Sequence, residues 1–284
     1  MDSLHLTQET REKLSGNFVE LKDGWTHYEI SGPDNGLPLM LIHGNAAPMQ
    51  SWDNNTGYFN SRGFKVIRYD VFGHGFSDRP MLKRYDMELY LNQLDGLIEC
   101  LGIEKVYLAG TSQGGAIAAN YAALNPDKVI KIAFLSPYVD AHGGLIMTKL
   151  LRSRMGESIM AKFGERALAA KPKGFISGTA AADLGNKLKV QFEYEGRGRA
   201  VLANLRGDSF QSQAHIYRRI ARSNIPSFIS WGECDTSIPY ASIERLRKII
   251  PDAEYHQLSR AAHLAHYELS EILNPLIADF FISK

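Results

Sequence analysis

Three residues in this sequence have the side-chain types and the chain order needed for nucleophilic catalysis, namely Ser112, Asp235 and His263. Ser112 lies between Gly110 and Gly114 in the pattern Gly-x-Ser-x-Gly. Placed between a strand and a helix, this pattern forms a tight turn that strains the serine backbone and exposes the hydroxyl group. A serine becomes a nucleophile when a histidine takes its proton and a carboxylate orients that histidine. The three side chains therefore indicate acyl-transfer chemistry.

The residues around Ser112 predict the strand and the helix that such a turn requires. Residues 106–109 are apolar and β-prone, which predicts a buried strand. Residues 116–124 are rich in alanine, which predicts a helix. Glycine is needed on both sides of the serine, because a Cβ there would collide with the neighbouring strand or helix. The first N–H groups of the helix would point toward a negative charge that forms beside Ser112.

Asp235 and His263 each follow a predicted strand. Asp235 lies in the loop after the strand at residues 225–231, and His263 lies in the loop after the strand at residues 254–258. The carboxyl ends of parallel strands share one edge of a sheet, where active sites form. We therefore expect the two side chains to meet Ser112 at this edge.

Five other polar side chains compete for these roles. They are Asp140, His266, His43, His74 and Asp70. Asp140 follows the strand predicted at residues 129–135 and is the alternative acid to Asp235. We interpret His266 as packing near the site, and His43 and His74 as shaping its rim. Asp70 is expected to hold its own glycine-rich loop.

Strands and helices alternate in two blocks of the chain. Strands are predicted at residues 18–21, 25–30, 37–42, 64–69, 106–109, 129–135, 225–231 and 254–258. Helices are predicted at residues 52–61, 86–101, 116–124, 243–250 and 264–281. This alternation is typical of a parallel sheet with right-handed crossovers. The predicted fold class is α/β, with a mostly parallel central sheet flanked by helices.

The alternation stops between the two blocks. We find helical segments and no strand there, at residues 145–155, 158–170, 188–205 and 212–222. The chain is therefore divided into a core of residues 1–136 and 225–284 and a helical cap inserted at residues 137–224. The cap holds fifteen Lys and Arg against seven Asp and Glu, a formal charge of +8, whereas the whole chain carries +1. Such a cap could favour anionic substrates or make weak contact with anionic surfaces, although a solvated helical surface is the simpler explanation.

The composition excludes several other classes of protein. A hydrophobic content of 44% and a charged content of 22% are ordinary for a globular protein, and a net charge of +1 argues against nucleic acid as a partner. Two cysteines, Cys100 and Cys234, are too few for a disulfide framework or a metal cluster. We find no signal peptide at the N-terminus and no run of 18 apolar residues. These features together predict a cytoplasmic protein.

Taken together, the motifs resemble those of α/β-hydrolase-fold proteins that carry a helical cap. The matching stretches are HGN at residues 43–45, DVFGHGFSD at 70–78, GTSQGG at 110–115, WGECDTSIP at 231–239 and HLAHYE at 263–268. They run through nearly the whole predicted core. Ala262 precedes the histidine where the family often has glycine, and we expect no consequence from this small difference.

The resemblance implies a role for each site residue. Ser112 would be the nucleophile, His263 the general base and acid, and Asp235 the carboxylate that orients it. The backbone N–H groups of Asn45 and Gln113 would form the oxyanion hole. No metal or organic cofactor is required for this chemistry.

The identity of the nucleophile limits the reactions that this site could catalyse. Dehalogenases and epoxide hydrolases of this family attack with an aspartate, so Ser112 disfavours their chemistry. We predict a serine hydrolase for carboxylic esters with small to medium apolar acyl chains, similar to a carboxylesterase or monoacylglycerol lipase, with the cap setting the substrate. The alternatives are a carbon–carbon bond hydrolase or a lactonase of the same fold and, from another class, a small-molecule receptor with a slow triad.

Overall fold

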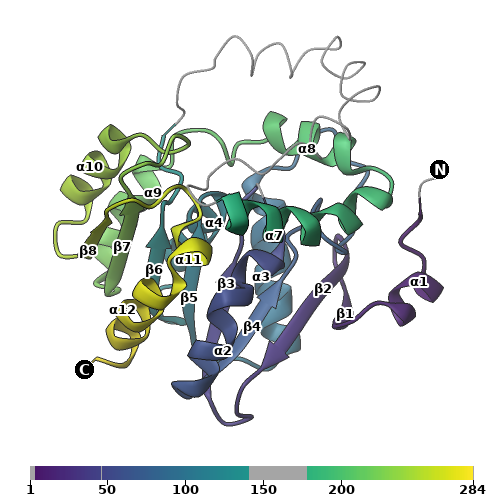
Figure 1. The fold of residues 1–284 in the computed structure, drawn as a ribbon, viewed down its shortest axis with the longest axis horizontal. Helices are drawn as coiled ribbons and strands as arrows, with labels where there is room; N and C mark the ends of the chain where they lie inside the picture. The colour runs from purple at the N-terminus through teal and green to yellow at the C-terminus, as the bar shows by residue number, and fades with distance from the viewer. Residues whose placement is uncertain (1–3, 46, 141–177, 284) are drawn as a thin grey trace.

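The computed structural model describes residues 4–45, 47–140 and 178–283 of the chain (Figure 1). The helices predicted at residues 145–155 and 158–170 lie outside the described residues. The described residues form one eight-stranded sheet in the order β1-β2-β4-β3-β5-β6-β7-β8. Strands β4, β3, β5, β6, β7 and β8 are parallel, whereas β1 and β2 join that edge in antiparallel pairing. The predicted fold class is therefore confirmed.

The strands lie close to their predicted positions. Their bounds are β1 Asn17–Leu21, β2 Gly24–Ser31, β3 Leu37–Ile42, β4 Phe64–Tyr69, β5 Val106–Thr111, β6 Val129–Leu135, β7 Ser227–Gly232 and β8 Glu254–Leu258. In β3, Met40 and Ile42 belong to one buried cluster, and Leu39 and Leu41 belong to another. Alternate side chains of a strand point to opposite faces. The continuous apolar run of β3 therefore arises because the sheet is covered on both faces.

Helices cover the two faces of the sheet. Their bounds in the core are α1 Gln8–Lys13, α2 Asp53–Ser61, α3 Met87–Cys100, α4 Gln113–Leu124, α10 Tyr240–Ile249, α11 Ala265–Glu268 and α12 Ser270–Ile282, with a 3-10 turn η1 at Met49–Trp52. Helices α3, α4 and α10 supply the first buried cluster, and α2 and α12 supply the second. The helix predicted at residues 264–281 is in fact two helices, because the backbone at Leu269 leaves the helical region with φ −119° and ψ 39°.

The described part of the cap is helical, and it contains no strand between residues 178 and 224. Its elements are α7 Gly178–Lys189, the 3-10 turn η2 Val190–Glu193, α8 Arg197–Arg206 and α9 Ala214–Ser223. The prediction of one helix at residues 188–205 is wrong, because Gly196 adopts a left-handed φ of 83° and separates η2 from α8. Helix α7 lay mostly outside the predicted helical segments. In Figure 1, α7 and α8 cross the top edge of the sheet.

Two contacts attach α7 to the core. Leu184 and Leu188 pack with Ala47, Leu264 and Tyr267 in one buried apolar cluster. The ammonium group of Lys187 lies 2.9 Å from Asp53 Oδ2 and donates a hydrogen bond of 3.0 Å to the hydroxyl of Tyr267. Within the described ranges, no helix is both long enough and apolar enough to cross a membrane.

Candidate active site

Ser112 occupies the turn between β5 and α4, and its backbone is strained. It has φ 54° and ψ −120°, a conformation that residues with a side chain rarely adopt. Backbone hydrogen bonds hold the turn through both the N–H and the carbonyl group of Ser112. Ser112 N donates to Leu135 O at the end of β6 over 3.0 Å, and Ser112 O accepts from the N–H of Tyr138 over 2.9 Å. The neighbouring strand thus fixes a serine that the sequence pattern predicted in this conformation.

The glycines around Ser112 are required by close backbone contacts. A Cβ on Gly110 would lie 2.4 Å from Gly114 O, and a Cβ on Gly114 would lie 2.2 Å from Ile42 O. A Cβ on Gly44 would lie 2.9 Å from the Cβ of Ser112. The predicted need for glycine on both sides of the serine is confirmed. Gly44 adds a third position, because there the loop after β3 passes directly beside the serine.

Asp235 and His263 form a buried pair. The Nδ1 atom of His263 lies 2.8 Å from Asp235 Oδ2. The other carboxylate oxygen accepts hydrogen bonds from the backbone N–H groups of Ser237 and Ile238, over 2.7 Å and 2.9 Å. Burial works to raise the pKa of Asp235, but the hydrogen bond and charge of His263, helped by the two N–H groups, lower it below its usual range. Asp235 is therefore an ionised group that holds the imidazole by one oxygen.

The loops that carry the three side chains meet at one edge of the sheet. Strands β5, β7 and β8 are parallel, so the loops after them lie on the same side. Cys234 N donates to Ala261 O over 2.9 Å, which joins the loop of Asp235 to the loop of His263. Leu264 packs against Ala47 of the loop after β3, the same loop whose Gly44 lies beside Ser112.

The described residues contain no hydrogen bond from Ser112 Oγ to His263 Nε2. In enzymes without bound substrate this bond is often long, and it shortens in the complex. The structure thus places the loops of the three predicted residues at one edge of the sheet, with Asp235 and His263 in contact. Their catalytic roles stay predictions.

The two N–H groups predicted for the oxyanion hole belong to Gln113, directly after Ser112, and to Asn45 in the loop after β3. Gln113 is the first residue of α4, so its N–H has no partner within the helix. Asn45 directly follows Gly44. Neither N–H donates to an acceptor in the described part of the chain. Both donors are free to bind an oxyanion, and this role also stays a prediction.

A residue that the sequence analysis did not identify joins the side chains of these two positions. Asn204 of α8 is buried, and its Nδ2 donates to Asn45 Oδ1 over 2.8 Å and to Gln113 Oε1 over 3.1 Å. Its Oδ1 accepts from Gln113 Nε2 over 2.8 Å and from the hydroxyl of Tyr90, also over 2.8 Å. Gln113 Nε2 also donates to Ser209 Oγ over 2.9 Å. One cap side chain therefore holds both residues of the predicted oxyanion hole.

Only a weak sequence signal could have pointed to Asn204. It follows the apolar residues Val201, Leu202 and Ala203 inside a helix, where asparagine is an unfavourable residue. An asparagine in the interior of a helix indicates that a tertiary hydrogen bond compensates. The signal does not identify the partners, which lie in two distant loops.

A cation of the cap lies near the site without a carboxylate partner among the described residues. Arg197 is 3% exposed, and it donates to the carbonyl oxygen of Gly73 over 3.1 Å. The next residue, His74, contacts the backbone oxygen of Asn45 over 3.0 Å. Burial, and then the charge of Arg79, lower the pKa of Arg197 to about 9. A nearby anion would relieve the cost of burying this charge.

Three other histidines near the site are packed into the structure and show no sign of a catalytic role. His43 Nε2 accepts from the N–H of Val71 over 2.9 Å, so its Nδ1 carries the proton that contacts Gly44 O at 2.8 Å. Burial lowers the pKa of His43, and it lowers the pKa of His74 well below the usual range. His266 packs against the ring of Trp52 at 4.4 Å between centroids, and burial lowers its pKa to about 3. These three imidazoles are neutral parts of the scaffold.

The two other aspartates are held away from His263. Asp140 accepts from Ser212 Oγ over 2.6 Å and pairs with Arg245 over 2.9 Å. Asp70 pairs with His27 and accepts from the N–H groups of Met49 and Phe76, both over 3.0 Å. Asp140 is therefore not the partner of the histidine, and Asp70 holds its own loop as the sequence indicated.

The described residues contain no group of three or more His, Cys, Asp or Glu side chains that could hold a metal ion. Both cysteines are exposed free thiols. In the predicted roles, His263 would take the proton of Ser112, and the N–H groups of Asn45 and Gln113 would stabilise an oxyanion. This is the chemistry of attack on a carbonyl carbon.

Comparisons with known proteins agree with this architecture. A family profile described as alpha/beta hydrolase fold matches residues 38–269. A protein from Paraburkholderia phymatum, named 2-hydroxy-6-oxononadienedioate/2-hydroxy-6-oxononatrienedioate hydrolase, is 26% identical over 95% of this chain and 96% of its own length. The similarity thus spans both the core and the cap.

Solved structures support the fold. An enol-lactonase from Burkholderia xenovorans superposes with a TM-score of 0.76 at 19% identity, covering 93% of this chain and 99% of its own. A thermophilic esterase from Thermogutta terrifontis superposes with a TM-score of 0.77 at 20% identity, covering 93% of this chain and 98% of its own. At these identities the likeness is one of fold.

Proposed function

Because the chain belongs to the alpha/beta hydrolase fold family, we propose that it hydrolyses a carbon–carbon bond beside a ketone in an anionic, conjugated substrate. The nucleophile is Ser112, the general base and acid is His263, and Asp235 orients the imidazole. The observation that carries this proposal is the similarity over nearly the full length to a hydrolase of 2-hydroxy-6-oxononadienedioate. It favours the carbon–carbon alternative of the sequence analysis over the carboxylester prediction.

The first half of the reaction forms an acyl-enzyme. His263 Nε2 takes the proton of Ser112, and Oγ attacks the ketone carbon. The carbonyl oxygen becomes an oxyanion between the N–H groups of Asn45 and Gln113. When the oxyanion collapses, the carbon–carbon bond breaks and its electron pair passes to the leaving carbon. His263 returns the proton to that carbon.

The second half releases the acid. A water molecule loses a proton to His263 and attacks the acyl carbon, and Ser112 Oγ leaves with the proton. An ester would follow the same steps, with the electron pair passing to an alkoxide oxygen. The triad therefore serves either substrate. A carbon leaving group needs a conjugated carbonyl to accept its electron pair.

The charge around the site supports an anionic substrate. Arg197 is a buried cation without a carboxylate partner among the described residues, and it lies beside the loop that contacts Asn45. A substrate carboxylate near this cation would compensate for its burial. The relative's named substrate is a dianion, which agrees with this charge.

The test compares two substrates on one enzyme. Purified protein is given 2-hydroxy-6-oxononadienedioate, followed by loss of the absorbance of its conjugated system, and p-nitrophenyl butyrate, followed by phenolate release. We expect kcat/KM to be at least about a hundredfold higher for the dienedioate, a difference of about 2.7 kcal/mol in transition-state binding. The Ser112→Ala variant measures the background for both. Faster turnover of the ester would overturn the proposal, and a single burst without turnover would indicate a receptor.

A further inference from the structure

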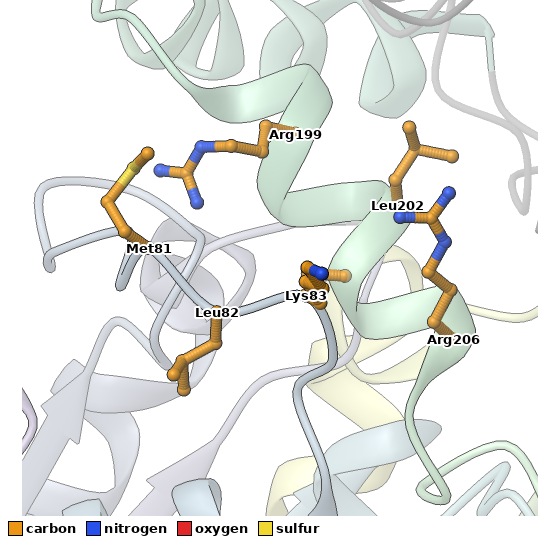
Figure 2. A pocket seen from close by; sticks show the side chains of 7 residues that line it. Met81, Leu82, Lys83, Arg199, Leu202 and Arg206 are labelled. Atoms are coloured by element: carbon orange, nitrogen blue, oxygen red, sulfur yellow. The ribbon is translucent and has the colours of Figure 1, made fainter. Parts of the chain in front are cut away.

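A pocket opens on the side of α8 opposite Asn204. Its volume is about 410 Å³, and Figure 2 shows its lining side chains. One wall is the loop of Met81, Leu82 and Lys83. The other wall is α8, which contributes Arg199, Leu202, Ala203 and Arg206. This volume lies within the range of small-molecule sites in proteins.

The loop wall of the pocket exposes two large apolar side chains, which folding usually buries. Met81 is 84% exposed and Leu82 is 46% exposed, whereas Leu202 and Ala203, which line the same pocket from α8, are buried. Two adjacent large apolar side chains at the tip of a loop leave a substantial apolar area in water. Burying that area against a hydrocarbon chain would be favourable.

The rim of the pocket is cationic. Lys83, Arg199 and Arg206 line it, and none of the lining residues in the described part of the chain is acidic. A neighbouring pocket of about 550 Å³ shares Met81 and Arg199, but it is also lined by Asp23, Asp78 and Glu195. The difference in charge means that an anionic group is favoured in the first pocket and not in the second.

The pocket is formed before any ligand arrives, because hydrogen bonds join its two walls. Arg199 Nη1 donates to Pro80 O over 2.7 Å, and its Nη2 donates to Arg79 O over 2.6 Å. At the other end of the loop, Tyr85 N donates to Ala203 O over 2.9 Å. Residues 81–84 therefore span two fixed points. Little conformational entropy would be lost on binding.

We propose that this pocket binds a single-chain anionic amphiphile, such as a medium-chain fatty carboxylate. The hydrocarbon chain lies against Met81 and Leu82, and the carboxylate lies at the rim beside Lys83. The site is separate from Ser112, because it occupies the face of α8 opposite Asn204. It does not depend on which bond the enzyme hydrolyses.

The test is a calorimetric titration of the full-length Ser112→Ala protein with decanoate, below the concentration at which decanoate aggregates. Two variants alter the exposed loop, where the fold tolerates change: Met81→Ser combined with Leu82→Ser, and Lys83→Glu. Two controls make the same changes elsewhere, at the exposed Leu124→Ser and Lys105→Glu. We expect each loop variant to weaken decanoate binding about five- to tenfold, and the controls to leave it unchanged. Decan-1-ol, which has the same chain without the charge, should bind more weakly than decanoate.

Three results would overturn the proposal. The first is decanoate binding that the loop variants leave unchanged, which would place the ligand elsewhere. The second is an equal loss in Lys105→Glu, which would mean attraction to net charge alone. The third is binding to vesicles of anionic phospholipid but not to monomeric decanoate, which would make the loop a surface anchor instead of a ligand site.

Discussion

Two histidine–aspartate pairs are buried in this molecule with the same geometry. His27 Nδ1 lies 2.8 Å from Asp70 Oδ2, and His263 Nδ1 lies 2.8 Å from Asp235 Oδ2. In both pairs the carboxylate also accepts two backbone N–H groups. The pairs differ in the second ring nitrogen. His27 Nε2 contacts the carbonyl oxygen of Ser15 over 2.8 Å, whereas His263 Nε2 has no hydrogen-bond partner in the described ranges.

We expect this difference to separate a pair that fixes the scaffold from one that moves a proton. A carbonyl oxygen on Nε2 favours an imidazole that is protonated at both nitrogens, because both then donate. Burial works to lower the pKa of His27, but Asp70 and the Ser15 carbonyl together raise it. Burial likewise works to raise the pKa of Asp70, and His27 lowers it. We infer that the group opposite the second ring nitrogen, more than the pairing with aspartate, determines whether a histidine can move a proton.

The largest expected effect comes from removing the group that His263 is predicted to serve. Ser112→Ala should lower kcat by a factor on the order of 10⁴ to 10⁶, because no nucleophile remains for the base to activate. The thermal midpoint should stay the same or rise slightly, since alanine removes no buried hydrogen bond. Steady-state kinetics and calorimetry on the same preparation check both. Turnover at the wild-type rate by a pure, folded variant would contradict the site assignment.

The next effect tests which acid serves the base. Asp235→Asn should lower kcat by roughly 10⁴, because an amide would hold the wrong tautomer of His263. Asp140→Asn is the matched control, since Asp140 pairs with Arg245 instead of a histidine. We expect it to change kcat less than about twofold, as for other surface ion pairs. A larger loss of kcat from Asp140→Asn than from Asp235→Asn would contradict the assignment of Asp235 as the acid that orients His263.

The equivalent change in the other pair should affect stability instead of chemistry. His27→Gln leaves Asp70 buried with one partner fewer, and breaking a buried ion pair costs about 3 to 5 kcal/mol. We expect a clearly lower thermal midpoint and an unchanged kcat for the folded fraction. Chemical denaturation monitored by fluorescence gives the free energy of unfolding. A lost kcat at unchanged stability would mean that both pairs take part in catalysis.

The pH dependence of this loss follows from the two pKa shifts. The raised pKa of His27 means that its contribution is complete below the ordinary histidine pKa and disappears as the pH rises through the raised value. The lowered pKa of Asp70 means that its contribution is present above the ordinary carboxyl pKa and disappears in stronger acid. The difference in thermal midpoint between wild type and His27→Gln should therefore be largest between about pH 4.5 and 6.5 and shrink at higher pH. A difference that grows from pH 6 to pH 9 would contradict the ion pair.

The smallest expected effect comes from replacing Asn204, the cap residue that contacts both residues of the predicted oxyanion hole. Asn204→Ala should lower kcat about tenfold with little change in KM, because Asn45 and Gln113 lose the side chain that holds them, whereas their N–H groups remain. Asn186→Ala, at an exposed position of α7, is the control and should have no effect. Asn204→Asp should restore part of the rate by accepting from Gln113. A rise in KM of about tenfold without a change in kcat would assign Asn204 to substrate binding alone.

Much of the core could be predicted because its signals are local. The strand at Leu37–Ile42 is a continuous apolar run, and the turn at Ser112 is specified by glycines within two residues. In the cap, the helix at Ala214–Ser223 was predicted close to its bounds, but the breaks between the other helices were not. Gly196 interrupts a stretch whose composition otherwise favours a helix, and its φ of 83° lies in the left-handed region that glycine adopts readily. The break at Leu269, by contrast, has no glycine or proline to mark it.

The sequence by itself determined the α/β class and the strained serine, since each depends on residues near one another in the chain. It also showed the chain order of Ser112, Asp235 and His263. The tertiary structure decided the partners. Asp235 and His263 are 28 residues apart, and His27 and Asp70 are 43 apart. Asn204 meets Gln113 and Asn45 across 91 and 159 residues. A side chain's type shows which hydrogen bonds it can make, but only the packing of distant segments determines which of those bonds form.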